Sequence, residues 1–235
     1  MNTNSNTYTV IYSIILVVVV AAVLAFAAMF LKPTQEANVK KDTISQILTA
    51  ATVQGEDILA TYKQEIEAAI LVDIDGNKVG ELSIEDCEVY DNAGLKKQTI
   101  ASEKALPVYI FKNGITVVPC CGAGLWGPIW GYIGLEGDLQ TIKAVCFGHK
   151  GETPGLGAKC VEPSFTDQFK GFNPSEKTLK VKKDGGDVDA ITASTITSRA
   201  YANGLAVAAN VFATIAGTPM PLDAATGSSV NNTEE

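Results

Sequence analysis

The chain has 235 residues, and its 26 acidic side chains outnumber the 18 basic ones, which gives a net charge of −8 and an isoelectric point of about 4.8. This acidic balance argues against a nucleic-acid-binding protein and against adhesion to an anionic membrane surface, because both partners are negatively charged. The part of the chain after residue 31 is long enough for one compact domain with a buried core.

The N-terminal part of the chain predicts a membrane-spanning helix. A short flank, residues 1–9, is followed by an apolar segment at 10–31, and no charged side chain precedes Lys32. A helix of about 22 residues is roughly 33 Å long, which is enough to cross the hydrocarbon core of a bilayer. A cleaved signal peptide is the alternative, with Ala25-Phe26-Ala27 as its cleavage site. We favour an uncleaved anchor, because a basic N-terminal region is missing and the apolar segment is too long for a signal peptide.

Charge alone does not decide the orientation of this helix. The first basic side chains, Lys32, Lys40 and Lys41, follow the apolar segment, and the positive-inside rule places them in the cytoplasm. Glu36 and Asp42 weaken this bias. The side of the membrane on which the rest of the chain lies is therefore left open by the residues themselves.

Residues 32–56 are expected to connect the anchor to the domain, which is expected at 57–217. Lys32-Pro33 is predicted to end the hydrophobic helix, since proline interrupts the interior of a helix. An amphipathic connecting helix should follow and break near Gly55. Its apolar positions are Val39, Ile44, Ile47 and Leu48.

The domain is predicted to contain several hairpins and one long C-terminal helix. Helical patterns occur at 57–69, at 164–169 as a single turn, and at 194–215. The expected strands are residues 70–74, 79–84, 107–112, 115–118, 129–135, 141–147 and 178–182. Asp75-Gly76-Asn77 and Asn113-Gly114 are typical hairpin turns. This order indicates an α+β fold with a mainly antiparallel sheet, followed by a disordered polar tail at 218–235.

One glycine-rich segment imitates a dinucleotide-binding motif. Residues 122–127 satisfy the spacing Gly-x-Gly-x-x-Gly and follow a predicted strand. A dinucleotide site needs a helix to begin there, because the N-terminus of that helix binds the pyrophosphate. Pro128 instead introduces another strand-like run. We therefore reject a nicotinamide dinucleotide site at this segment.

The cysteines do not indicate a metal or iron–sulfur site. The chain has five of them, at Cys87, Cys120, Cys121, Cys146 and Cys160. No pair has the Cys-x-x-Cys spacing that such centres use. Cysteines in apolar strands are mostly buried small side chains, and an odd number leaves at least one thiol free. We predict no metal ligands, and the single histidine leaves no convincing catalytic triad.

A segment rich in hydroxyl groups precedes the long C-terminal helix. A helix should begin near Ser194, because apolar side chains recur downstream at helical spacing, at Ile196, Ala200, Val207, Val211 and Ile215. Thr195 would then lie in the first turn, where unpaired backbone N–H groups and the helix dipole favour a phosphate group. The alternative interpretation is that Ser194 only caps the helix.

Residues 189–195, Asp-Ala-Ile-Thr-Ala-Ser-Thr, resemble the flavin-attachment signature of the FMN-binding domain family, Asp-x-x-Ser/Thr-Gly-Ala-Thr. The resemblance implies that Thr195 carries FMN through a phosphoester bond, which a flavin transferase would form. Ala193 and Ser194 stand where glycine and alanine are usual, and both are small enough for the backbone to approach a phosphate. The other residues implied around the cofactor here are Asp189, Thr192, Ser194 and Thr197.

A second segment, residues 149–157, supports the same family. It contains Glu-Thr-Pro-Gly-Leu-Gly, which in the family lies against the isoalloxazine ring of the flavin. One proline and two glycines make a rigid turn whose backbone can approach a flat ligand. The resemblance implies Leu156 as an apolar contact of the ring, with Glu152, Thr153 and Gly155 as further cofactor-binding residues. Two motifs in the expected order are more specific than either alone.

Trp126 relates the chain to one branch of this family. Residues 122–131 resemble the Gly-Leu-Trp motif of the C subunits of the sodium-translocating NADH:quinone reductases. Trp126 would either contact the flavin or pack in the core. The resemblance implies an electron-carrier subunit with covalent FMN in a sodium-pumping complex that transfers electrons from NADH to ubiquinone or menaquinone. Such a subunit is not expected to oxidise NADH alone, and FMN needs no acid–base residue of the protein to move an electron.

The resemblance also implies a place in the cell and a set of partners. The domain would face the periplasm from the inner membrane, and its partners would be the other subunits of the complex. Three alternatives are left open. They are the G subunit of the ferredoxin-linked Rnf complex, a free-standing flavinylated reductase, and a non-enzymatic anchored domain that binds an anionic ligand near Thr195.

Overall fold

The computed structural model of the protein describes residues 6–73, 77–91 and 105–215. The tail expected at 218–235 lies outside the described residues, as do residues 74–76 of the predicted turn at 75–77 and residues 92–104. Contacts between residues divide the chain into two compact units, Met1–Lys41 and Asp42–Glu235.

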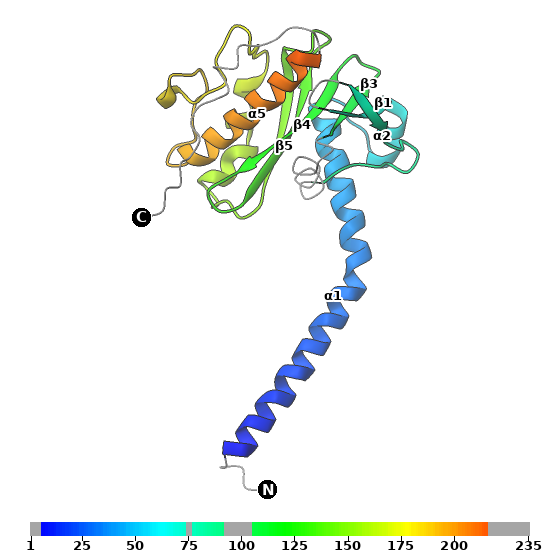
Figure 1. Cartoon of the computed structure of the whole chain (residues 1–235), viewed down its shortest axis with the longest axis vertical. Coiled ribbons are helices and arrows are strands. Elements are labelled where there is room, and N and C mark those ends of the chain that lie inside the picture. Colours follow the sequence, from blue (N-terminus) through cyan, green and yellow to red (C-terminus); the bar gives the residue numbers. More distant parts are fainter. Residues whose placement is uncertain (1–5, 74–76, 92–104, 216–235) are drawn as a thin grey trace. The chain divides into compact units, whose positions relative to one another are not determined.

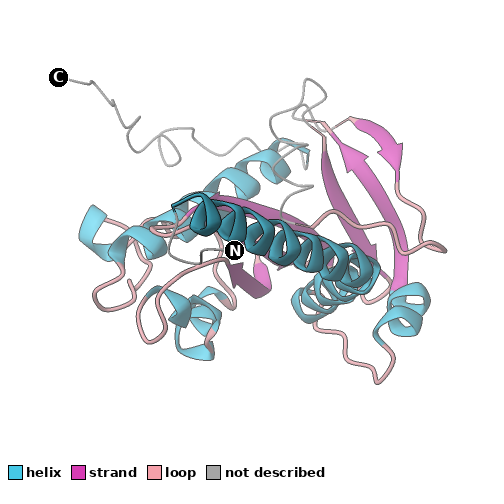
Figure 2. Ribbon diagram, turned by 90° about the horizontal axis from the view of Figure 1, so that it is seen from below, coloured by secondary structure: helices cyan, strands magenta, loops and turns pink. Residues whose placement is uncertain are grey.

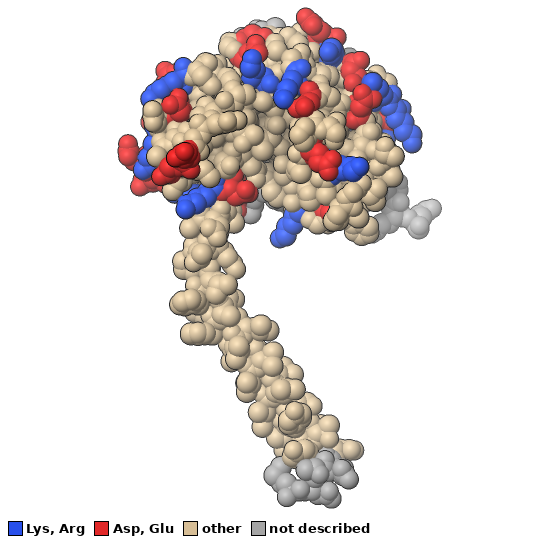
Figure 3. Space-filling model, turned by 180° about the vertical axis from the view of Figure 1, so that it is seen from behind, with Lys and Arg blue, Asp and Glu red and all other residues tan. Residues whose placement is uncertain are grey.

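The first unit consists of the greater part of helix α1, which spans Asn6–Ala50 (Figure 1). This helix is long and apolar enough to cross a membrane, and the side chains of its apolar stretch are exposed. No charged residue precedes Lys32, and Figure 3 shows this length of the helix without acidic or basic side chains. The helix is therefore a candidate membrane anchor.

The prediction that the hydrophobic helix ends at Pro33 is wrong, because α1 continues through this residue to Ala50. A proline inside a helix removes one backbone hydrogen bond and costs about 3 kcal/mol. The end of α1 buries Ile44 and Ile47 completely within the second unit. Pro33 is exposed, so its ring displaces no packed side chain, and the helix continues past it at the cost of its local hydrogen bond.

The second unit is built on one six-stranded sheet in which every neighbouring pair is antiparallel. The order across the sheet is β2-β1-β3-β4-β5-β6. The strands are β1 Ile66–Val72, β2 Lys78–Glu81, β3 Leu106–Phe111, β4 Thr116–Ala123, β5 Pro128–Leu135 and β6 Ile142–His149. Strands and helices both occur along the described chain (Figure 2), so the predicted α+β class with a mainly antiparallel sheet is confirmed.

One face of the sheet packs against the end of α1 and against α2, Ile58–Glu65. Asp57 caps the start of α2 by accepting hydrogen bonds from the backbone N–H groups of Leu59 and Ala60. This helix is shorter than the one predicted over 57–69. After an irregularity between Ile66 and Ala68, the side chains alternate between the two faces of the sheet, with Ala69 and Leu71 in one core cluster and Ile70 and Val72 in the other, and this burial on both faces favours a strand.

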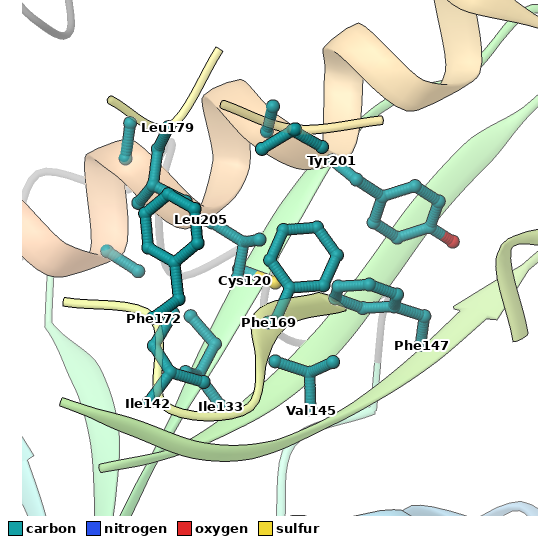
Figure 4. Close-up of a cluster of buried hydrophobic side chains, with 14 of the residues drawn as sticks. Cys120, Ile133, Ile142, Val145, Phe147, Phe169, Phe172, Leu179, Tyr201 and Leu205 are labelled. Atoms are coloured by element: carbon teal, nitrogen blue, oxygen red, sulfur yellow. The ribbon is translucent and has the colours of Figure 1, made fainter. Parts of the chain in front are cut away.

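The opposite face of the sheet is covered by α5, Thr195–Ile215, which lies across β4 and β5 in Figure 1. This helix confirms the one predicted at 194–215. Its buried side chains include Tyr201 and Leu205, and Figure 4 shows both in one apolar cluster with Phe147 of β6 and with Phe169. The ring centroids of Phe147 and Tyr201 are 4.3 Å apart. This cluster fixes the start of α5 relative to the end of β6.

Between β6 and α5 the described chain contains only short helical segments. They are η1 Gly157–Val161, α4 Pro163–Thr166, η2 Asp167–Phe169 and η3 Lys182–Asp184. The helical turn predicted at 164–169 is confirmed. The strand predicted at 178–182 is wrong, because only an isolated bridge joins Val181 to Val188. After Val181 the chain enters η3 and a tight loop at Gly185, whose φ is 83°, and it returns so that Val188 lies beside Val181 in a parallel bridge.

Candidate functional site

A cavity of about 380 Å³ lies in the second unit, and its wall comes from two segments that are far apart in the sequence. One segment follows β6 and includes η1 and α4, and the other immediately precedes α5. The lining residues are Gly155, Leu156, Lys159, Ser164, Phe165, Asp189, Ala190, Ile191, Thr192 and Ala193. The structure therefore brings the two sequence motifs to one cavity.

The segment before α5 contains Ala193 in a backbone conformation that glycine adopts more easily. Ala193 has a φ of 60°, in the left-handed region, where a side chain costs roughly 1–2 kcal/mol. Glycine is usual at this position of the signature, and glycine adopts this conformation freely. Alanine here accepts the strain, and the chain still makes the turn that leads from the cavity wall into α5.

Two hydrogen bonds of Ser198 hold this turn against the helix. The Ser198 hydroxyl donates to the carbonyl of Ser194 at 3.0 Å and accepts from the backbone N–H of Ile191 at 2.9 Å. Ser198 is completely buried. The Ser194 hydroxyl has no hydrogen-bond partner among the described residues, so the cap considered from the sequence is not seen.

Thr195 is the first residue of α5 and is half-buried, whereas Thr192 is exposed and lies on the cavity wall. The first backbone N–H groups of a helix have no partner in a preceding turn, and the dipole adds partial positive charge at this end. Thr195 is not among the residues that line the cavity, but it lies at the helix N-terminus two residues after Ala193, which does line it. This environment suits a phosphate group.

Asp189 lies on the cavity wall and is held through its backbone by Gln168. Its N–H donates to Gln168 Oε1 at 2.7 Å, and its carbonyl accepts from Gln168 Nε2 at 3.2 Å. The Asp189 carboxylate is exposed and pairs with Lys182 Nζ at 2.8 Å. Sequence reasoning missed Gln168, because 21 residues separate it from Asp189 and no motif includes it.

The loop after β6 forms a tight turn that makes the other part of the cavity wall. The carbonyl of Thr153 accepts hydrogen bonds from the N–H groups of Leu156 and Ala158, at 3.1 and 3.2 Å. Gly155 has a φ of 77°, which this turn requires. Leu156 is 41% exposed on the cavity wall, so it offers an apolar side chain to a ligand. The predicted rigid turn is present with Leu156 and Gly155 at the cavity.

Glu152 occupies a different environment from the one its motif suggests. Its side chain is buried, only 5% exposed, and it is not among the residues that line the cavity. Its Oε2 accepts a hydrogen bond from the Thr197 hydroxyl at 2.7 Å, and its Oε1 accepts from the Trp126 backbone N–H at 3.1 Å. Glu152 and Thr197 therefore contact each other behind the cavity wall.

Trp126 does not pack in the core, since its side chain is 68% exposed. It lies in the turn between β4 and β5, where the Gly124 N–H donates to the carbonyl of Gly127 at 2.8 Å. The strand β5 follows directly at Pro128. The glycine-rich segment therefore makes a turn between antiparallel strands and opens no helix for a pyrophosphate, as the sequence predicted.

The sequence analysis missed several lining residues, among them Lys159 and Phe165. Lys159 is a cation on the cavity wall, and it makes no ion pair among the residues that the structure describes. Phe165 is buried in the apolar cluster and gives the cavity an aromatic part of its wall. Lys159 lies two positions after the end of the second motif, so its nearness to the motif was a signal in the sequence.

The cysteines lie apart from this cavity, and all five thiols are free. Burial raises the pKa of the Cys146 thiol to about 11 and raises the pKa of Cys120 still further. Thiols of this kind stay protonated and unreactive near neutral pH. Among the described residues, no three histidine, cysteine, aspartate or glutamate side chains gather in a group that could hold a metal ion.

Comparison with known proteins connects this cavity to a family. Residues 124–210 match the FMN-binding domain, and this range includes Trp126 and both motifs. The chain is 30% identical over 213 residues to the C subunit of the Na(+)-translocating NADH-quinone reductase of Vibrio parahaemolyticus, covering 76% of this chain and 81% of that protein. It is 27% identical over 226 residues to the same protein of Haemophilus ducreyi, covering 85% and 87%.

A solved structure shows that the fold is also similar to that of a known protein. The crystal structure of the Na(+)-translocating NADH-quinone reductase C subunit from Parabacteroides distasonis superposes with a TM-score of 0.64 at 30% sequence identity. The superposition covers 81% of this chain and 98% of that chain. The structural similarity therefore extends over almost all of that crystallised chain.

Proposed function

Because the chain belongs to the family of Na(+)-translocating NADH-quinone reductase C subunits, we propose that it carries FMN covalently on Thr195 and passes electrons between neighbouring subunits of such a complex. It is an FMN-carrying electron-transfer subunit. The proposal extends this to a sodium-pumping complex that takes electrons from NADH and delivers them to ubiquinone or menaquinone.

The cavity supports this proposal by its size and by the two segments that form it. Sites for small ligands and cofactors have volumes of about 300–1,000 Å³, and this cavity has about 380 Å³. Leu156 offers an apolar surface to the flat ring, and the backbone of the turn at Gly155 is accessible. FMN, when bound, supplies the electron chemistry through its ring, so the chain's residues have to bind and orient it.

Thr195 is the residue that would hold the phosphate of FMN. A flavin transferase that uses FAD would bring the diphosphate to this helix end. The Thr195 oxygen would form a bond to the phosphorus of the FMN half, the bond to AMP would break, and the hydroxyl proton would leave. The N–H groups of the first turn of α5 stabilise negative charge at this place. Thr192, Ser194 and Asp189 would flank the phosphate.

The residues around the ring would act through shape and charge. Thr153, Gly155 and Leu156 would face the ring from one side, and the exposed indole of Trp126 would reach it from the turn between β4 and β5. Lys159 would bring a positive charge to the same cavity. This cation favours a ring that has gained negative charge, because opposite charges attract strongly where water is partly excluded.

The place of this protein in a membrane complex follows from α1 and from the family. α1 would anchor the chain in the inner membrane, with the domain on the periplasmic side, next to the other subunits of the complex. The turn at Gly124–Gly127 is no nicotinamide site, so the protein is not expected to oxidise NADH alone.

The single observation that carries the proposal is the cavity bounded by both family motifs. Mass spectrometry of the full-length chain, isolated from a host with a flavin transferase, tests it. We expect FMN on the proteolytic peptide that contains Thr195, and yellow colour that survives denaturation. A native chain whose flavin is released on denaturation, or that binds none, would contradict covalent attachment and favour a non-covalent anion-binding domain.

A further inference from the structure

Glu152 is a buried carboxylate without a cation. Its side chain is 5% exposed, and no lysine, arginine or histidine forms an ion pair with it among the described residues. Both of its oxygens accept hydrogen bonds, and the Trp126 backbone N–H can act only as a donor. Burying a carboxyl group is costly unless hydrogen bonds satisfy its oxygens, and both oxygens of Glu152 have such partners.

The carboxylate connects three segments of the flavin-binding region. Trp126 belongs to the turn between β4 and β5, Thr197 belongs to α5, and Glu152 itself precedes the loop that lines the cavity. The two hydrogen bonds span 26 and 45 residues of sequence. One side chain thus contacts two segments that are far from it in the sequence.

Two glycines make room for this carboxylate. A Cβ atom placed on Gly124 would lie 2.5 Å from Glu152 Oε1, and one placed on Gly157 would collide with Oε2. Neither glycine has a positive φ, so backbone conformation does not account for them. The close approach of the backbone to the carboxylate does account for them.

The carboxylate also lies close to a residue next to the cavity wall. Leu156 lines the cavity, and a Cβ atom on its neighbour Gly157 would collide with Glu152 Oε2. In the other segment, Thr197 is two residues along α5 from Thr195. Glu152 therefore links the loop that faces the ring to the helix that presents the attachment hydroxyl.

We propose that Glu152 is the positioning residue of the flavin site and that its buried negative charge holds the reduction potential of the flavin low. The proposal rests on the proposed function, since it concerns a flavin held in this cavity. The hydrogen bond from the Thr197 hydroxyl to Glu152 sets the distance between the loop that would face the ring and α5. Placing an electron on the ring near a fixed negative charge, with little water between them, is electrostatically unfavourable.

Glu152→Gln separates the charge from the hydrogen bonds. The glutamine carbonyl can accept from the Trp126 N–H, and its amide can donate to the Thr197 hydroxyl, which then acts as an acceptor. The full-length variant should acquire covalent flavin as the wild type does, with a midpoint potential shifted to more positive values. Glu162→Gln is the matched control, because Glu162 is an exposed carboxylate near the same loop and solvent screens its charge.

Thr197 tests the positioning role independently. Thr197→Val keeps the shape of the side chain and removes the hydroxyl that bonds Glu152, so the flavin absorption and fluorescence spectra should change. Thr197→Ser retains the hydroxyl and should restore the wild-type spectra. If circular dichroism shows that Glu152→Gln does not fold, this pair of variants still decides the positioning role.

The outcomes distinguish this inference from the proposed function. The proposed effect of the charge is contradicted if Glu152→Gln carries covalent flavin and its midpoint potential equals that of the wild type and of Glu162→Gln. Spectra of Thr197→Val identical to those of the wild type overturn the positioning role. A wild-type chain without covalent flavin refutes the proposed function itself, and mass spectrometry reports that result separately.

Discussion

The guanidinium of Arg199 forms two hydrogen bonds with the carboxylate of Asp184, at 2.5 Å from Nε and 2.7 Å from a terminal nitrogen. Arg199 lies in the second turn of α5, and Asp184 belongs to η3. The same η3 segment holds Lys182, the partner of Asp189. This bidentate pair therefore joins α5 to the loop that leads into the cavity wall.

The pair predicts a contribution to stability that depends on pH. Arg199 lowers the pKa of the Asp184 carboxyl through its hydrogen bonds and its positive charge. A carboxyl with a lower pKa in the folded state adds stability above its unfolded pKa of about 3.9, and loses it as the pH falls through the folded value. Arg199→Gln should therefore lower the Tm slightly near neutral pH and leave it unchanged in strong acid. The effect is small because the pair is exposed.

Thermal unfolding followed by circular dichroism at several pH values measures this effect. Lys170→Gln is the control, since Lys170 and Asp167 form another exposed pair and lie outside α5. An Arg199→Gln variant that loses as much Tm in strong acid as at neutral pH would show that the pair does not act through the Asp184 charge.

Thr195→Ala should abolish covalent attachment of FMN and leave the domain folded. The side chain is half-buried at a helix start, so its replacement should change the free energy of unfolding by less than about 1 kcal/mol. In-gel flavin fluorescence after denaturation measures attachment, and Thr192→Ala is the control that should keep it. Covalent flavin in Thr195→Ala, carried by Thr192 or Thr197, would assign the attachment to another residue.

Leu156→Asp should change the environment of the flavin without releasing it. Leu156 lines the cavity, so a carboxylate there would place negative charge beside the ring, whereas the proposed phosphoester is at Thr195. We expect a more negative midpoint potential and altered flavin fluorescence, with unchanged covalent flavin by mass spectrometry. Val161→Asp is the control, because Val161 is similarly exposed, at 47%, and does not line the cavity. Equal spectra and potentials in both variants would leave this loop with a structural role only.

Ile47→Ala should destabilise the second unit although the residue belongs to α1. Ile47 is 0% exposed and packs with Tyr109 and Phe111 of β3 in one core cluster. Large-to-small changes at such positions cost about 2–5 kcal/mol, which should lower the Tm clearly. Val39→Ala, at a position that is 47% exposed on the same helix, should change the Tm little. An unchanged Tm for Ile47→Ala would mean that the end of α1 does not support the domain.

The orientation in the membrane is predicted from the family, against the local lysine count. We expect protease added to intact spheroplasts to digest the domain, because the domain would face the periplasm. A cytoplasmic protein of the same cells is the control and should survive until lysis. Protection of the domain in intact spheroplasts would instead support the positive-inside interpretation of Lys32, Lys40 and Lys41.

Much of the fold could be predicted because its signals are local. Strand-like apolar runs identified β3, β5 and β6 within one or two residues, and the helical period identified α5. The errors occurred where a local signal was taken as decisive. Pro33 does not end α1, and residues 178–182 lead into η3 and the loop at Gly185, so that only an isolated parallel bridge joins Val181 to Val188.

The sequence by itself determined the apolar anchor segment, the antiparallel class, the start of the attachment helix and the two motifs of the cavity, since each depends on residues within a few positions of one another. Only the tertiary structure decided the role of Glu152. The motif suggested a polar contact with the cofactor, yet the side chain is buried and accepts hydrogen bonds from Trp126 and Thr197. These partners are 26 and 45 residues away, and no local pattern encodes contacts that form only when a sheet and a helix pack together.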